Sequence, residues 1–134
     1  MKVIDDHLLN IISQRASTDN RLRKNYNLHQ DLGESVQRLL NALEPGTQLP
    51  VHRHRHTDET YIILRGRLHV KTYNDSGELS NFIVLDPREG KYGVSISANE
   101  WHTIEIIEKG TVIFEVKNGP YRPLSDDEVM EVKE

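Results

Sequence analysis

The sequence predicts an all-β fold, a sandwich or barrel of short strands, preceded by one short helix. From residue 60 onward, short runs rich in Ile, Val, Tyr, Phe and Thr are separated by turn signals such as residues 74–77 (NDSG), Asp86-Pro87 and Lys109-Gly110. Many short strands with evenly spaced turns are typical of sandwiches and barrels rather than of alternating β and α units. The chain has no internal repeat, which argues against a solenoid.

Length and composition indicate one domain. The 134 residues suffice for a single core, and we expect a helix within residues 1–18, barrel strands over 21–123 and a charged tail over 124–134. Cysteine is absent, which excludes disulfides and thiolate zinc sites. The net charge of −4 argues against general nucleic-acid binding.

Neither a membrane span nor a secretion signal is visible in the sequence. No apolar run reaches the roughly 18 residues of a membrane helix, and MKVIDDHLLNII lacks a signal-peptide cleavage pattern. We therefore expect a soluble, cytoplasmic protein.

The N-terminal helix is predicted by apolar residues at helical spacing: Ile4, Leu8, Leu9, Ile11 and Ile12. Either Asp5 or Asp6 can cap it, and both suit the positive end of the helix dipole. A single helix does not make a helix-turn-helix, so a DNA-binding function has no element to carry it.

Residues 21–29 (RLRKNYNLH) alternate with a period of two, which predicts a strand with one polar, donor-rich face. That face is either solvated or turned towards an anionic or hydroxyl-rich ligand. The next segment, VQRLLNALEPGT, fits a helix or a strand. We predict a strand over 38–43, because Pro45-Gly46 follows at once as at a strand-to-turn junction.

The stretch from Gly46 to Gly66 carries the most informative pattern. His52, His54 and His56 lie at alternate positions, and Glu59 follows them. Histidines at every second residue share one face of an extended chain. Three imidazoles beside a carboxylate indicate a metal site, with the choice of ligands open among them.

The spacing resembles the first signature of the cupin superfamily: a glycine, five residues, His-X-His, four residues, a glutamate, six residues and a glycine. The resemblance implies that His52, His54 and Glu59 are metal ligands. Physical reasoning agrees, because a turn through residues 55–58 is needed to bring Glu59 to the face of the two histidines. His56 then lies in the turn, either as an exposed imidazole or as a proton carrier at the pocket mouth.

A second cupin signature is present in degraded form in SISANEWHTIEI. It aligns Ser97 with a usual proline, Asn99 with a usual glycine and His102 with the third histidine ligand. Asparagine accepts left-handed backbone angles more readily than most residues, so Asn99 is a tolerable substitute. Three histidines and one carboxylate suit one divalent transition metal, and iron, zinc, nickel, manganese and copper all fit.

Beyond these motifs, the chain resembles the WbuC family of small cupin-fold metalloproteins. The resemblance is carried by RLRKNYNLH, VQRLLNALEPGT, ETYIILRGR, EWHTI and EVKNGPYRP. It implies a cupin-type jelly-roll β-barrel with the metal in its mouth, and a setting among surface-polysaccharide (O-antigen) genes. By analogy with other small cupins we also expect a homodimer.

Two classes of function follow from this resemblance. In the first, the protein is a metal-dependent enzyme acting on a sugar or sugar nucleotide, an isomerase or epimerase, with an iron-dependent dioxygenase as a variant. Glu59 or His56 would move the proton, and Tyr61 shares the face of Glu59. Hydrogen bonds to the ligand would come from Arg21, Arg23, Asn25, Arg38 and Arg65. In the second, the protein is a non-catalytic metal- or carbohydrate-binding module; a cavity lined by Arg and Asn would favour the enzyme.

Overall fold

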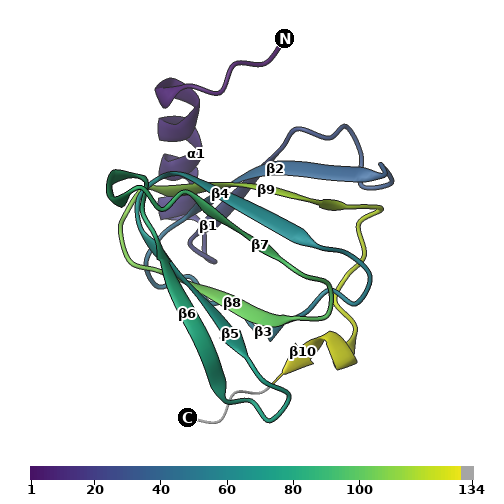
Figure 1. The fold of residues 1–134 in the computed structure, drawn as a ribbon. Helices are drawn as coiled ribbons and strands as arrows, with labels where there is room; N and C mark the ends of the chain where they lie inside the picture. The colour runs from purple at the N-terminus through teal and green to yellow at the C-terminus, as the bar shows by residue number, and fades with distance from the viewer. Residues whose placement is uncertain (131–134) are drawn as a thin grey trace.

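The computed structural model describes residues 1–130 and confirms the all-β prediction. Two five-stranded antiparallel sheets face each other, and one helix lies outside them (Figure 1). The first sheet has the order β1 (Arg23–Asn27), β2 (Val36–Leu43), β9 (Thr111–Asn118), β4 (Glu59–Arg65) and β7 (Gly93–Ile96). The second has the order β10 (Val129–Met130), β3 (Val51–His52), β8 (Trp101–Ile106), β5 (Leu68–Tyr73) and β6 (Leu79–Leu85). Two short 3₁₀ turns complete the elements, η1 (Pro87–Glu89) and η2 (Asp126–Glu128).

Helix α1 (Asp6–Thr18) begins at an aspartate cap. The side chain of Asp5 accepts a hydrogen bond of 3.0 Å from the backbone N–H of Leu8. This bond satisfies one of the N–H groups that the first helical turn leaves without a partner. Of the two aspartates that the sequence offered, Asp5 is therefore the cap, and Asp6 lies in the first turn.

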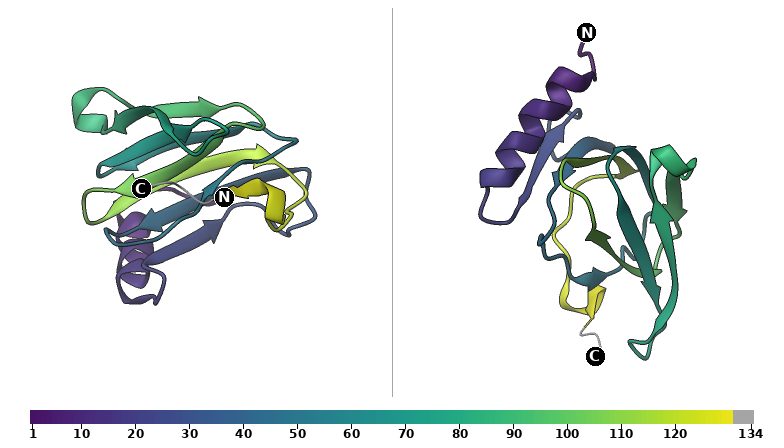
Figure 2. Two further views of the ribbon diagram at one scale, coloured as in Figure 1. Left: turned by 90° about the horizontal axis from the view of Figure 1, so that it is seen from below. Right: turned by 90° about the vertical axis from the view of Figure 1, so that its left-hand side faces the viewer.

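Helix α1 covers the outer face of the first sheet beside β1 and β2, as the right-hand view of Figure 2 shows. The helix contributes Leu9, Ile12 and Ala16 to a buried cluster with Leu40, Ala42 and Val112 of the sheet. The opposite face of β2 is buried too, since Leu43 belongs to the core between the sheets. A strand buried on both faces is almost continuously apolar, which is why its sequence also fitted a helix.

The main core fills the space between the two sheets. Its buried members come from seven strands and are Leu43, Tyr61, Ile63, Leu68, Val70, Leu85, Ile96, Ile104, Ile106 and Ile113. Most of these residues alternate along their strands with exposed or half-buried ones, which is the pattern of a sheet with one face turned inward. The polar residues of the candidate site lie among the same strands.

The C-terminal segment is more ordered than its composition indicated. Within the charged tail predicted over 124–134, β10 pairs with β3 and places Val129 opposite His52. Its preceding turn is tied to the histidine-bearing loop: the backbone N–H of Arg55 donates to the Glu128 carboxylate at 3.1 Å, and Arg55 pairs with Asp127 at 2.8 Å. The rest of the predicted tail, 131–134, lies outside the described residues.

Within residues 1–130, the helices are too short or too polar to cross a membrane.

Candidate metal centre

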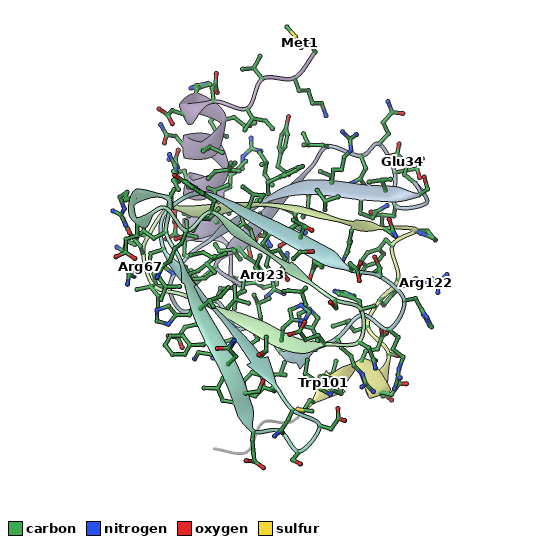
Figure 3. The ribbon with its side chains drawn as sticks, in the orientation of Figure 1. Met1, Arg23, Glu34, Arg67, Trp101 and Arg122 are labelled. Carbon is green, nitrogen blue, oxygen red and sulfur yellow. The ribbon has the colours of Figure 1, made fainter. Side chains whose placement is uncertain are left out.

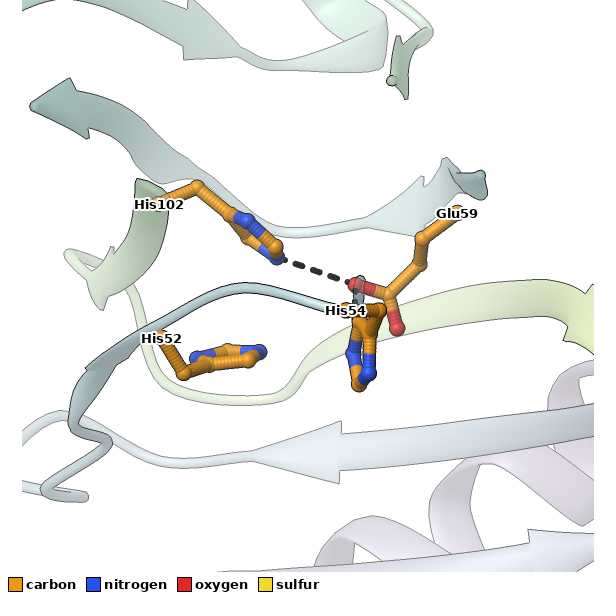
Figure 4. A group of neighbouring side chains, drawn as sticks. All are labelled: His52, His54, Glu59 and His102. Carbon is orange, nitrogen blue, oxygen red and sulfur yellow. Dashed lines mark hydrogen bonds and ion pairs between the residues drawn. The ribbon is translucent and has the colours of Figure 1, made fainter. Parts of the chain in front are cut away.

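Three histidines and a glutamate meet between the two sheets (Figure 4). His52 ends β3, His54 follows in the next loop, Glu59 begins β4 and His102 lies on β8. Their ligand atoms all lie within 4.8 Å of one another. The pairing of β3 with β8 sets His52 directly opposite His102. Residues 50 positions apart therefore become neighbours through strand register.

The loop that separates His54 from Glu59 is held by the loop that precedes His102. The backbone N–H of Asn99 donates to the carbonyl of His54 at 2.7 Å, and that of Ala98 donates to the Asp58 carboxylate at 2.8 Å. Asn99 has a φ of +72°, the left-handed conformation that the sequence predicted for it. The two motifs thus fix each other's geometry.

Two of the histidines have their outer ring nitrogens engaged by backbone carbonyls. Nδ1 of His52 lies 3.0 Å from the oxygen of Pro50, and Nδ1 of His102 lies 2.8 Å from the oxygen of Glu100. A carbonyl oxygen only accepts, so each Nδ1 carries the proton. Nε2 of each neutral ring then keeps its lone pair, and such backbone contacts commonly orient histidine ligands.

Glu59 concentrates several contacts on one carboxylate oxygen. Oε1 accepts a hydrogen bond of 2.6 Å from the hydroxyl of Tyr61 and lies 3.0 Å from Nε2 of His102. Nε2 of His54 lies 3.6 Å from the same oxygen. Because Nδ1 of His102 carries the proton of the neutral ring, Nε2 of His102 is an acceptor, as is Oε1 of Glu59. Two acceptors this close repel each other unless a cation, either a proton or a metal ion, lies between them. The donor set and its tautomers fit a divalent transition metal.

Protonation states at the centre favour metal binding. Burial opposes ionisation of Glu59, but its close contacts with His102 and His54, whose rings donate and carry positive charge when protonated, hold its pKa well below the usual value. Burial, reinforced by the charge of His102, lowers the pKa of His52 to about 4. At neutral pH the centre therefore holds a carboxylate and a neutral imidazole, the forms that bind metals.

The centre opens on a cavity of about 350 Å³. His52, His54 and Glu59 line it, whereas His102, only 1% exposed, lies behind them. Of the side chains that we expected at the ligand, Arg23, Asn25 and Tyr61 also line this cavity. The polar face of the strand at 21–29 therefore turns inward at Arg23 and Asn25.

Arg65 does not line this cavity. Its guanidinium binds α1 instead, with Nη1 2.7 Å from Oδ1 of Asn10 and Nη2 3.1 Å from Oγ of Ser13. The pairing of β4 with β9 shifts register between Ile63 and Arg65. This irregularity ends the alternation that linked Arg65 to Glu59.

Arg21, Arg38 and His56 also lie outside the lining of the cavity. Arg21 precedes β1 and pairs with Asp19 at 3.6 Å. Arg38 shares the parity of Leu40 and Ala42, which pack under α1, so it belongs to the outer face of β2. His56 is exposed in the loop before β4.

Several lining residues were missed from sequence: Asn41, Glu115, Lys117, Tyr121 and Arg122. A signal existed for two of them, since Glu115 and Lys117 share the parity of the core residue Ile113 on β9. Burial, with the nearby charge of Glu59, raises the pKa of Glu115 to about 7, against a hydrogen bond from Asn41. Arg122 follows the last strand of the first sheet and offered no periodicity to read.

Comparison with models of known families identifies the family of this chain. A family model described as a domain of unknown function, DUF6016, matches residues 4–85. The chain belongs to the DUF6016 family. No curated protein sequence matches this DUF6016 protein.

Solved structures show which fold the DUF6016 protein has. A cupin superfamily protein from Desulfitobacterium hafniense is 20% identical with a TM-score of 0.55, covering 72% of this chain and 76% of that one. KdgF from Halomonas sp. is 12% identical with a TM-score of 0.59, covering 78% and 85%. The capsular polysaccharide assembling protein CapF from Staphylococcus aureus is 17% identical with a TM-score of 0.60, covering 79% of this chain but 28% of that one. The fold is a cupin jelly-roll sandwich.

Proposed function

We propose that this protein is a metal-dependent enzyme that acts on a small anionic, hydroxylated molecule of the sugar or sugar-nucleotide class. The observation that carries the proposal is the opening of the His52, His54, Glu59 and His102 cluster onto a cavity lined by cationic side chains. A purely structural metal site would be closed, with no space for a ligand beside it.

The four clustered residues would hold the metal. When bound, a divalent ion would act as a Lewis acid that polarises a carbonyl or hydroxyl oxygen of the ligand. Tyr61 holds Glu59 in place through its hydroxyl, and burial together with the charges of Glu59 and Glu115 raises its own pKa, so that it stays a neutral donor.

The charge of the cavity supports an anionic ligand. Arg23, Lys117 and Arg122 line it, and none of the three forms an ion pair with a carboxylate of the described chain. Arg23 and Arg122 are labelled in Figure 3 and come from opposite ends of the barrel sequence. Since the whole chain carries a net charge of −4, these cations are a local feature. Phosphate and carboxylate groups are the usual partners of arginine in such positions.

The sugar class rests on two similarities. The sequence resembles the WbuC family, whose setting is surface-polysaccharide formation, and the structure resembles a protein named for capsular polysaccharide assembly. We therefore propose a sugar or sugar-nucleotide intermediate of surface-polysaccharide formation as the substrate.

Elemental analysis of untagged protein, purified without chelators, tests the metal centre. We expect about one transition metal per chain, lost in the His52→Ala/His54→Ala double variant and strongly reduced in His102→Ala. His56→Ala is the matched control, because His56 lies on the same segment but is exposed outside the cluster. A parent protein that takes up no metal after reconstitution would refute the proposal.

Titration calorimetry with UDP-glucose tests the ligand class on the metal-loaded protein. We expect Arg23→Ala to weaken binding and Arg21→Ala to leave it unchanged, since only Arg23 lines the cavity. Binding without turnover of any sugar nucleotide would favour the non-catalytic module instead.

A further inference from the structure

Glu115 gives the cavity a second carboxylate, separate from the metal cluster. It lies on β9, where its register partner is Tyr61 of β4, and its side chain lines the cavity. The amide Nδ2 of Asn41, on the neighbouring strand β2, donates a hydrogen bond of 3.1 Å to Oε1 of Glu115. The cluster of possible metal ligands in the described chain does not include it. Glu115 is thus positioned by Asn41 and not committed to the metal.

The other oxygen of Glu115 is free to contact a ligand. Oε1 is engaged by Asn41, while Oε2 accepts no hydrogen bond from residues 1–130. Oε2 is not one of the solvent-inaccessible side-chain atoms that lack a hydrogen-bond partner, so it is accessible to solvent. It is therefore reached from the cavity. A partly buried carboxylate oxygen requires a donor, which water supplies when no ligand is bound and which a ligand hydroxyl can replace.

We propose that Glu115, held by Asn41, binds a hydroxyl group of the ligand. This inference rests on the proposed function and adds the orientation of the substrate. Whether ionised or protonated, the Glu115 side chain exchanges a hydrogen bond with a hydroxyl group, and in its ionised form it repels phosphate and carboxylate groups. The hydroxylated part of the ligand therefore lies at Glu115, and its anionic part lies towards Arg23 and Arg122.

Such a contact makes the protein selective for hydroxylated ligands over deoxygenated ones of the same shape. A ligand without the hydroxyl leaves the Glu115 oxygen desolvated and unpaired, which is the arrangement that discriminates most strongly between hydroxyl-bearing molecules and their analogues. Hydrogen bonds to charged groups correspond to a preference of about tenfold or more.

Calorimetry with two matched phosphates tests this on the metal-loaded protein. α-D-Glucose 1-phosphate and cyclohexyl phosphate share a six-membered ring and a phosphate, but the second lacks the hydroxyls, the hydroxymethyl group and the ring oxygen. We expect the parent to bind the glucose compound at least about tenfold more tightly. In Glu115→Gln and Glu115→Leu this ratio should fall, mainly through weaker binding of the glucose compound. Glu78→Gln, a loss of one exposed carboxylate in a turn, should keep the ratio of the parent.

The outcomes separate this inference from the proposed function. A parent that binds both phosphates equally, or neither, overturns the role of Glu115, as does an unchanged ratio in both Glu115 variants. Metal content, measured on the same samples, tests the proposed function independently. If the parent binds no metal but still prefers the glucose compound, and Glu115→Gln loses this preference, then the metal proposal fails. The hydroxyl site at Glu115 stands in that case. Thermal unfolding of each variant checks that it is folded.

Discussion

The hydroxyl of Tyr61 lies 2.6 Å from Oε1 of Glu59, the same oxygen that lies 3.0 Å from Nε2 of His102. Both Tyr61 and Glu59 are on β4, two residues apart and on one face of the strand. Tyr61 is 4% exposed, so its hydrogen bond is shielded from water. The tyrosine therefore orients the carboxylate from within the sheet that carries it.

Removal of this hydroxyl should weaken metal binding. In Tyr61→Phe the ring still fills its place in the core, but Glu59 loses a donor that fixes its orientation. We expect the dissociation constant for the metal to rise by about tenfold, the lower range for loss of a contact that orients a ligand. Competition with a chromogenic chelator measures it. Tyr92→Phe, at a residue that is 60% exposed, is the control, and equal affinities in the two variants would contradict the role of Tyr61.

Gly66, the last residue of the first motif, should tolerate no side chain. It has a φ of +94°, and a Cβ at this position would lie 2.6 Å from the Cα of Thr111 and 2.2 Å from its Oγ1. Gly66→Ala combines a left-handed backbone, which disfavours alanine by about 1–2 kcal/mol, with overpacking against a strand, which adds about 1–3 kcal/mol.

The matched control is Gly90→Ala, because Gly90 has a φ of +74° but nothing within 4 Å of the added Cβ. Urea unfolding measures the loss of stability in both variants, and the difference between the two losses is the steric contribution of the Cβ at position 66. Equal losses of stability would show that β9 moves away from Gly66 without penalty.

Asp86 should make stability depend on pH in the acid range. It accepts hydrogen bonds from Arg88 at 2.9 to 3.0 Å and one from Arg67 at 3.4 Å. The Arg88 hydrogen bond, against the opposing effect of burial, lowers the pKa of Asp86 from 3.8 to about 2. A carboxyl whose pKa is lower in the folded state stabilises it fully above the unfolded pKa, and this contribution disappears as pH falls towards 2.

The free energy of unfolding of Asp86→Asn should therefore lie below that of the parent at pH 6, and the gap should narrow between about pH 4 and pH 2. Urea titrations across this range measure the gap. Asp126→Asn, at an exposed aspartate, should follow the parent throughout. A gap that stays constant down to pH 2 would mean that the charge of Asp86 contributes nothing to stability.

Local patterns in the sequence were sufficient for the fold class, and together with the resemblance to the cupin signatures they indicated the four clustered residues. Strand alternation, turn residues and the spacing from Gly46 to Gly66 each report on neighbours along the chain. A turn of known length after His54 is enough to return Glu59 to the histidine face. Asn99 was read correctly for the same reason, because left-handed conformation is a property of a single residue.

Much of the cavity lining was decided only by tertiary structure, although Arg23, Asn25 and Tyr61 were expected there from the sequence. The register shift in β4 sent Arg65 to the helix, and the covering of β2 by α1 turned Arg38 outward. Glu115 and Arg122 reached the cavity from distant segments. Alternation fixes which residues share a face, but not which element covers that face or where a bulge interrupts it, since these depend on contacts between residues far apart in the chain. The sequence therefore determined the candidate metal ligands, and the assembled sheets decided what surrounds them.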